Sequence, residues 1–92
     1  SDLEEKLLGH PDVAEAAVIG IPSAKWGETP LGLVVCREGT SPDVQQLLDW
    51  TNGQVGRMQR LSAIEIRAEL PRNNAGKLLK PELRKPYWPA DA

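Results

Sequence analysis

The stretch Val13-Ala14-Glu15-Ala16-Ala17-Val18-Ile19-Gly20-Ile21 decides the fold of this chain. Except for one glutamate it consists of apolar or small residues, which is typical of a β-strand covered on both faces. A second apolar run, Leu31 to Cys36, follows a polar loop predicted from Pro22 to Glu28. Strands of this kind are expected to have helices packed against them, because their apolar side chains must be buried.

Ser62 to Leu70 predicts a third strand in a different environment. Its apolar residues alternate with charged ones and are expected on one face: Ile64, Ile66, Ala68 and Leu70. Alternation of this kind is typical of a strand that has one face in water.

A longer helix is predicted to begin at Ser41-Pro42-Asp43. The serine suits the N-cap, the proline suits the first turn, and the aspartate complements the helix dipole. Apolar residues then recur at helical spacing from Val44 to Met58. Gly53 and Gly56 each weaken this helix by about 1 kcal/mol relative to alanine, so its end is expected to fray near Gly56.

Two short helices complete the pattern, one from Asp2 to Leu8 and one from Pro81 to Arg84. The predicted order is helix, strand, strand, helix, strand, polar loop, helix. This order indicates an α+β fold class, with a small three-stranded, mainly antiparallel sheet and packed helices. The length of 92 residues fits one such domain with a modest core.

The composition excludes several classes of function. Basic residues number 11 and acidic residues 13, without a strongly basic segment, so no nucleic-acid partner is indicated. No apolar stretch is long enough to span a membrane. The single His10 and the single Cys36 are far apart in the sequence, so no metal site is predicted. A lone cysteine cannot form an internal disulfide, which fits a reducing, cytoplasmic location.

The segment Leu70-Pro71-Arg72-Asn73-Asn74-Ala75-Gly76-Lys77-Leu78-Leu79-Lys80 contains the clearest functional signal. It is a polar turn with one lysine at its tip, and a loop of this kind can bring an amine into the active site of another surface. Gly76 allows a tight turn, and the two asparagines tolerate left-handed backbone and form local hydrogen bonds. From the spacing alone, Lys77 is interpreted as a solvated turn lysine. The basic residues that follow are interpreted as a solvated helix face: Lys80, Arg84 and Lys85.

Three stretches follow one another at separations that match a known family: Leu8 to Pro22, Trp26-Gly27-Glu28, and Glu69 to Lys80. Together they resemble the small C-terminal domain of the adenylate-forming enzymes, which are the acyl-CoA synthetases, the adenylation domains of peptide synthetases and the luciferases. The resemblance implies that residues 1–92 are a mobile C-terminal lid. The family's large N-terminal nucleotide-binding domain, with its phosphate loop, is absent from this sequence. Because the chain starts at Ser1, without an initiator methionine or signal-peptide pattern, we expect it to be a piece of a longer protein.

By this resemblance, Lys77 is the catalytic lysine of acyl-adenylate formation. A carboxylate that attacks the α-phosphate of ATP brings two anions together, and a fixed ammonium can neutralise the charge that develops between them. Gly76 and Asn74 are implied to lie against the nucleotide or the adenylate. ATP, Mg²⁺ and CoA are the cofactors implied for the full-length enzyme, and none is expected to bind the fragment alone.

The resemblance also implies a CoA-binding surface formed by Trp26, Gly27 and Arg60. A tryptophan offers a stacking surface for adenine, and an arginine offers positive charge to phosphate. The sequence departs from the family pattern beside Arg60, where a frequent aromatic, lysine and proline are replaced by Met58, Gln59 and Leu61. A packing role for Trp26 and a solvated charge at Arg60 are the alternatives.

The function implied is that of one part of an ATP-dependent acid–thiol ligase, an acyl-CoA synthetase for a fatty acid or another carboxylic acid. Its partners would be its own N-terminal domain, the carboxylic acid and CoA, with a protein acetyltransferase as a further partner at Lys77. An alternative within the class is a peptide-synthetase adenylation domain, whose acceptor is a carrier protein. An alternative of another class is a stand-alone α+β interaction module. The fragment by itself is expected to be inactive.

Overall fold

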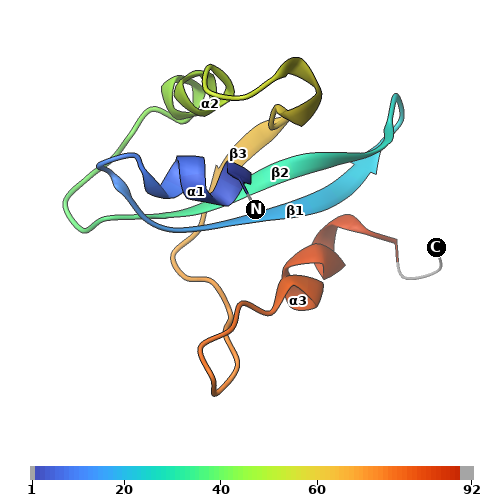
Figure 1. The fold of residues 1–92 in the computed structure, drawn as a ribbon. Helices are drawn as coiled ribbons and strands as arrows, with labels where there is room; N and C mark the ends of the chain where they lie inside the picture. Colours follow the sequence, from blue (N-terminus) through green and yellow to red (C-terminus); the bar gives the residue numbers. More distant parts are fainter. Residues whose placement is uncertain (1, 90–92) are drawn as a thin grey trace.

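The protein folds as a three-stranded sheet with helices on both of its faces (Figure 1). The computed structural model describes residues 2–89. β1 (Val13–Ser23) pairs with β2 (Gly27–Cys36) in antiparallel orientation, and β2 pairs with β3 (Ala63–Ile66) in parallel orientation. The strand order is β1-β2-β3. The α+β prediction is confirmed, and the sheet is mixed because its third strand runs parallel to the second.

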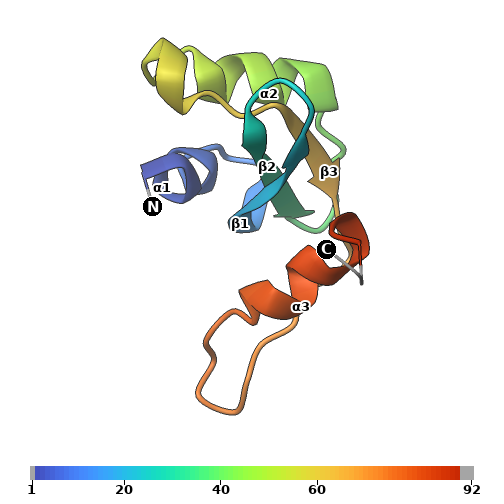
Figure 2. The ribbon, with the colours of Figure 1, turned by 90° about the vertical axis from the view of Figure 1, so that its right-hand side faces the viewer.

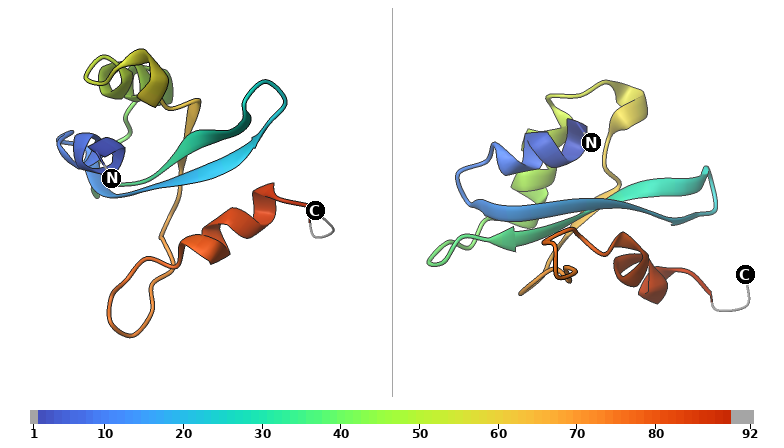
Figure 3. Two further views of the ribbon diagram at one scale, coloured as in Figure 1. Left: turned by 45° about the vertical axis from the view of Figure 1, so that its right-hand side comes forward. Right: turned by 60° about the horizontal axis from the view of Figure 1, so that its bottom comes forward.

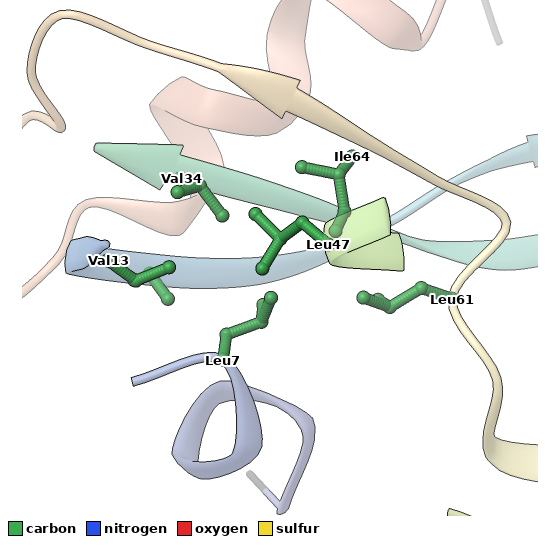
Figure 4. Packing of buried hydrophobic residues seen from close by; sticks show 7 residues of the cluster. Leu7, Val13, Val34, Leu47, Leu61 and Ile64 are labelled. Carbon is green, nitrogen blue, oxygen red and sulfur yellow. The ribbon is translucent and has the colours of Figure 1, made fainter. Parts of the chain in front are cut away.

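Each face of the sheet has its own hydrophobic core. α1 (Asp2–Leu8) and α2 (Val44–Asn52) cover one face, and α3 (Lys80–Arg84) lies against the other (Figures 2 and 3). In the core beneath α1 and α2, side chains from both helices and all three strands point toward one another (Figure 4): Leu7, Val13, Ala16, Val34, Leu47, Leu61 and Ile64. The core beneath α3 consists of Ala17, Ile19, Leu31, Leu33, Leu70 and Leu83. β1 is therefore covered on both faces, as its apolar sequence predicts.

The hairpin of β1 and β2 is longer than the sequence predicts. The loop predicted from Pro22 to Glu28 is wrong, because β1 continues to Ser23 and β2 begins at Gly27. Pro22 is tolerated in this strand because β1 is at the edge of the sheet. Every second residue of a strand directs its N–H to the same side, and the Val18 N–H points away from β2, toward Glu4. Pro22, four residues later, occupies an equivalent position, so its missing N–H removes no hydrogen bond between β1 and β2.

The start of α2 differs from the prediction by two residues. Asp43, and not Ser41, is the N-cap, since its carboxylate accepts hydrogen bonds from the backbone N–H groups of Gln45 at 2.9 Å and Gln46 at 3.4 Å. The aspartate thus satisfies two of the N–H groups that a helix start leaves without intrahelical partners.

The end of α2 also differs, since the helix stops at Asn52 and does not reach Met58. The Asn52 side chain accepts a hydrogen bond from the Leu61 N–H at 2.8 Å and donates one to the Leu61 carbonyl at 3.0 Å. This pairing fixes the path of the chain that leaves the helix. Met58 lies instead in a separate 3₁₀ turn, η1 (Arg57–Gln59), with its side chain 90% exposed.

β3 is shorter than the predicted strand over Ser62 to Leu70. Ile64 is buried in the core beneath α2, Ile66 is 44% exposed, and Leu70 is buried in the core beneath α3. The prediction of a single apolar face through Leu70 is therefore wrong, because the chain leaves the sheet after Ile66 and crosses to the opposite face.

Within residues 2–89, no helix combines the length and the apolar character needed to cross a membrane. In the same part of the chain, no group of three or more histidine, cysteine, aspartate or glutamate side chains is placed to hold a metal ion.

Candidate functional site

Lys77 lies in a narrow hairpin that projects away from the sheet on the side of α3 (Figure 1). We call residues 71–79 the lysine loop. Its two legs pair through a bridge between Arg72 and Leu78, and the Leu79 N–H donates to the Pro71 carbonyl at 3.0 Å. The loop is therefore an ordered hairpin held by specific backbone contacts.

Asn73 shapes the tip of this loop. Its side-chain oxygen accepts hydrogen bonds from the N–H groups of Ala75 at 2.9 Å and Lys77 at 3.0 Å. The Gly76 N–H donates to the Asn73 carbonyl at 2.9 Å, and Gly76 has a φ of +83°, the left-handed backbone that favours glycine. Asn74 is exposed at the tip. The prediction of local hydrogen bonding holds for Asn73, whereas no residue other than glycine within 2–89 has positive φ.

The Lys77 side chain is exposed, and no hydrogen bond or ion pair links it to another residue in the described range 2–89. Its backbone, by contrast, is held at both polar groups, because its N–H bonds Asn73 and its carbonyl accepts from the Asn73 N–H at 3.0 Å. The arrangement presents an ammonium on a flexible stem from a fixed base, which suits an anionic ligand brought by another surface.

Two ion pairs connect the lysine loop and the residue directly after it to other parts of the fold. The Arg72 guanidinium donates to Glu15 Oε1 at 2.8 Å and 3.2 Å, and Lys80 Nζ lies 2.7 Å from Glu4 Oε2. Glu4 also accepts a hydrogen bond from the Val18 N–H at 2.7 Å. The interpretation of Lys80 as part of a solvated helix face is therefore wrong. Glu15 had one signal in the sequence, since it is the only charge in the apolar run that forms β1.

Partial burial acts to raise the pKa of the Glu4 carboxyl, but the hydrogen bond and charge of Lys80 and the Val18 N–H outweigh it. The net result is a pKa below the ordinary value of 4.5. Glu4 is therefore ionised at neutral pH and holds Lys80 as a charged partner.

Trp26 lies at the turn between β1 and β2, far along the hairpin from the lysine loop. Its backbone N–H donates to Ser23 Oγ at 3.1 Å, and Gly27 closes the turn with a φ of +81°. Trp26 is 65% exposed, and Lys25 Nζ lies 4.9 Å from the centre of its ring. The alternative of a partly buried packing role for Trp26 does not fit this exposure.

Trp26 and Arg60 line one groove, although they come from different parts of the sequence. The groove has a volume of about 230 Å³, and its other lining residues are Thr29, Pro30, Arg57 and Met58. Arg57 and Met58, from η1, were not among the predicted site residues. The groove combines an exposed aromatic face with two guanidinium groups, a combination that can stack a flat base and bind phosphate.

The lysine loop and the β1–β2 turn lie near opposite ends of the β1–β2 hairpin (Figure 3), and the groove includes Trp26 of that turn. Glu15, which holds the loop, is near the start of β1, and Ser23, at the turn, is the last residue of that strand. Eight residues of extended chain span about 26 Å. The structure thus places the predicted site residues in two separate groups, Asn74, Gly76 and Lys77 in one, and Trp26, Gly27 and Arg60 in the other.

Comparisons with known proteins identify the family to which this chain belongs. The family model for the AMP-binding enzyme C-terminal domain matches residues 2–77. The 3-methylmercaptopropionyl-CoA ligase of Ruegeria pomeroyi is 40% identical over 86 residues, which cover 94% of this chain and 16% of the ligase. The fatty acid–[acyl-carrier-protein] ligase ScoC of Streptomyces coeruleorubidus is 36% identical over 88 residues, which cover 96% of this chain and 17% of that protein. The chain thus spans about one sixth of the length of these curated relatives.

A solved structure gives the same result for the fold. The ATP-bound MatB of Rhodopseudomonas palustris matches with a TM-score of 0.88 at 34% identity, over 94% of this chain and 17% of that chain. Sequence and fold similarity therefore extend over nearly the whole chain, and the resemblance seen in the three sequence motifs is confirmed. The chain belongs to the AMP-binding enzyme C-terminal domain family, whose members are parts of adenylate-forming enzymes.

Proposed function

We propose that this chain is the mobile C-terminal lid of a longer ATP-dependent acid–thiol ligase and that Lys77 is its adenylation lysine. The observation that supports this most directly is the lysine loop, in which a hydrogen-bonded turn holds the Lys77 backbone while the ammonium stays exposed. ATP and Mg²⁺ are assigned to the N-terminal domain of that ligase.

Lys77 acts on the first half-reaction. A carboxylate oxygen forms a bond to the α-phosphorus of ATP, the bond from that phosphorus to the bridging oxygen breaks, and pyrophosphate leaves. Negative charge increases on the oxygens between the two reacting groups, and the Lys77 ammonium stabilises it there. Gly76 and Asn74, at the same loop tip, lie against the adenylate.

The groove at the β1–β2 turn serves the second half-reaction, in which a thiol displaces AMP. Trp26 stacks on the adenine of CoA, Arg60 binds phosphate, and Gly27 allows the turn that exposes the ring. The exposed Trp26 ring and the guanidinium groups of Arg57 and Arg60 on one groove favour CoA as the acceptor.

A carrier protein is the second candidate acceptor. It is favoured by the similarity to ScoC, which is named for ligation to an acyl-carrier protein. A matched comparison of CoA and phosphopantetheinyl carrier protein in the thiolation step separates the two. The stand-alone interaction module is the remaining alternative, and a coding sequence with a phosphate loop directly upstream of this chain would eliminate it.

The test of the proposal is Lys77→Ala in the full-length protein, with ATP–pyrophosphate exchange as the readout. Loss of one oriented charge at a transition state is expected to slow exchange about 10²–10³-fold. Thiolation of supplied acyl-adenylate is expected to continue.

Acetyl-lysine placed at position 77 should reproduce the defect, because acetylation removes the charge and keeps the stem. This is the expected action of a protein acetyltransferase partner.

The matched control is Lys85→Ala, since within residues 2–89 Lys85 forms one ion pair, an exposed one with Glu82 on the neighbouring helix. Lys80 is unsuitable as a control because it binds Glu4. Equal losses of exchange in Lys77→Ala and Lys85→Ala would show that general positive charge is responsible, and the assignment to Lys77 would then fail.

A further inference from the structure

The Arg72 side chain connects β1 to the backbone next to Lys77. Its Nε and Nη2 donate to Glu15 Oε1 at 3.2 Å and 2.8 Å, and its Nη1 donates to the Gly76 carbonyl at 2.8 Å. That carbonyl belongs to the peptide bond that joins Gly76 to Lys77. One guanidinium therefore links a strand of the sheet to the peptide that precedes the lysine, which suits the fixed fork of arginine donors.

A second ion pair, at Lys80 directly after the loop, connects the start of α3 to the same strand. Lys80 binds Glu4 at 2.7 Å, and Glu4 accepts the Val18 N–H of β1 at 2.7 Å. Glu15 and Val18 flank Ala16 and Ala17, which are both buried, so both attachments end on a well-packed segment of β1.

We propose that Arg72 is a positioning residue for Lys77 and that Glu15 is the fixed point from which it acts, with the Glu4–Lys80 pair holding the chain directly after the loop. We call these four residues the loop clamp. This inference rests on the proposed function of Lys77 and concerns how the lysine is aimed.

The clamp is not needed for the local shape of the loop. Asn73 and the bridge between the two legs already form the turn, and their hydrogen bonds do not involve Arg72 donors. What those bonds leave open is the direction of the turn relative to the sheet. Leu78 constrains that direction by packing against the core beneath α3. The Arg72–Glu15 pair constrains it further, because it joins the opposite leg, and through Arg72 the Gly76 carbonyl at the tip, to β1.

Within the clamp, the Arg72–Glu15 pair has little reason to exist for stability alone. The side chains of Arg72 and Glu15 are 40% and 36% exposed, and ion pairs with such exposure contribute little to folding. The position of a catalytic group, in contrast, has a steep effect, since a misplacement of about 1 Å can cost about 10²-fold in rate. The expected signature is therefore a loss of rate without a comparable loss of stability.

The experiment uses the full-length protein and the variants Arg72→Ala, Arg72→Lys, Glu15→Gln and Lys85→Ala, with Lys77→Ala as reference. For each variant, kcat and KM of ATP–pyrophosphate exchange and the melting temperature are measured. Arg72→Ala is expected to lower kcat about tenfold, with KM for ATP and acid changed less than about twofold. Arg72→Lys is expected to lie between Arg72→Ala and the unmodified protein, because one ammonium lacks the fork that reaches both Glu15 and Gly76. Lys85→Ala is expected to be unchanged.

Hydrogen exchange of the peptide over residues 72–79 gives a readout that does not depend on chemistry. Faster exchange of the loop amides in Arg72→Ala, with an unchanged melting temperature, would support the clamp. A kcat in Arg72→Ala equal to that of the unmodified protein, beside a strong defect in Lys77→Ala, would overturn the positioning role and leave the proposed function intact. A normal kcat in Lys77→Ala would overturn both. If the variants that lose kcat lose melting temperature to a matching extent, Arg72 has a structural role, and the inference is also overturned.

Discussion

At the scale of single residues, the Glu4 carboxylate joins three elements that are far apart in the sequence. It projects from α1, accepts the Val18 N–H of β1, and pairs with Lys80 at the first residue of α3. Its side chain is only 16% exposed, so removal of either partner leaves a poorly solvated charge. This contact is therefore worth more to the fold than the exposed Lys85–Glu82 pair nearby.

A pH dependence follows from the lowered pKa of Glu4. Because the pKa of the folded state is below that of the unfolded chain, the unfolded chain binds more protons in the window between them, and stability rises with pH there. The contribution of Glu4 is complete above its ordinary pKa of 4.5 and is lost as the pH falls through the lower folded value.

Glu4→Gln in the 92-residue chain is therefore expected to lower the free energy of unfolding by about 1 kcal/mol at pH 7 and by less near pH 3. Urea titrations at the two pH values provide the measurement. Glu82→Gln, which breaks an exposed ion pair, is the matched control and should change the free energy of unfolding at pH 7 by less than about 0.5 kcal/mol. A Glu4→Gln deficit that stays constant from pH 7 to pH 3 would contradict the assignment.

At the scale of elements, the sequence predicts which segments form helices and strands better than where they end. β1, which is apolar on both faces, and β3, in which apolar and charged residues alternate, were expected, because side-chain periodicity reflects burial directly. The hairpin was predicted too short, since the polar residues near Pro22 suggest a loop while an exposed edge strand tolerates them. The end of α2 depends on the Asn52–Leu61 pairing, and no local pattern encodes such a tertiary contact.

In the candidate site, too, features encoded by a local motif were predicted and contacts between distant residues were not. Lys77 and the asparagine turn were predicted from a local motif, and the loop geometry follows from those residues. The partners of the loop were not predicted, because Arg72 and Glu15 are separated by 57 positions and only the fold brings them together. Arg57 and Met58 were missed for the same reason, since the groove exists only when η1 packs beside the β1–β2 turn.

The start of α2 offers a direct test at this scale. Asp43→Ala is expected to lower the free energy of unfolding by about 1 kcal/mol, because two N–H groups at the helix start lose their acceptor. Ser41→Ala, two residues earlier, is the matched control and should change stability by less than about 0.5 kcal/mol. Chemical denaturation of both variants is the measurement. A larger effect at Ser41 than at Asp43 would mean that the serine caps the helix after all.

At the scale of the whole molecule, the β1–β2 hairpin separates two surfaces. Its strands are the longest of the sheet, and its central part lies between the two cores. The lysine loop is attached near one end, and the groove includes Trp26 of the turn at the other. Under the proposed function, this separation lets the lid present the lysine loop to the reaction centre in one step and the groove in the next.

This arrangement predicts that the two half-reactions can be impaired separately. In the full-length protein, Trp26→Ala is expected to raise KM for CoA in thioester formation about tenfold, because loss of base stacking on an aromatic ring costs about 1–3 kcal/mol. ATP–pyrophosphate exchange should change less than about twofold, since the groove is about 26 Å of strand away from the loop anchor. Lys77→Ala should show the opposite pattern, with exchange lost and thiolation of supplied adenylate retained.

The matched aromatic control is Trp50→Ala, which removes a half-exposed tryptophan that packs against His10 on the α2 side and does not line the groove. It should leave KM for CoA unchanged, so a rise in both tryptophan variants would indicate a general effect on the fold. Parallel rate measurements of both half-reactions in all three variants decide the matter. If Trp26→Ala reduces pyrophosphate exchange as much as thioester formation, the two surfaces do not act in separate steps, and the assignment of the groove to the thiol acceptor is wrong.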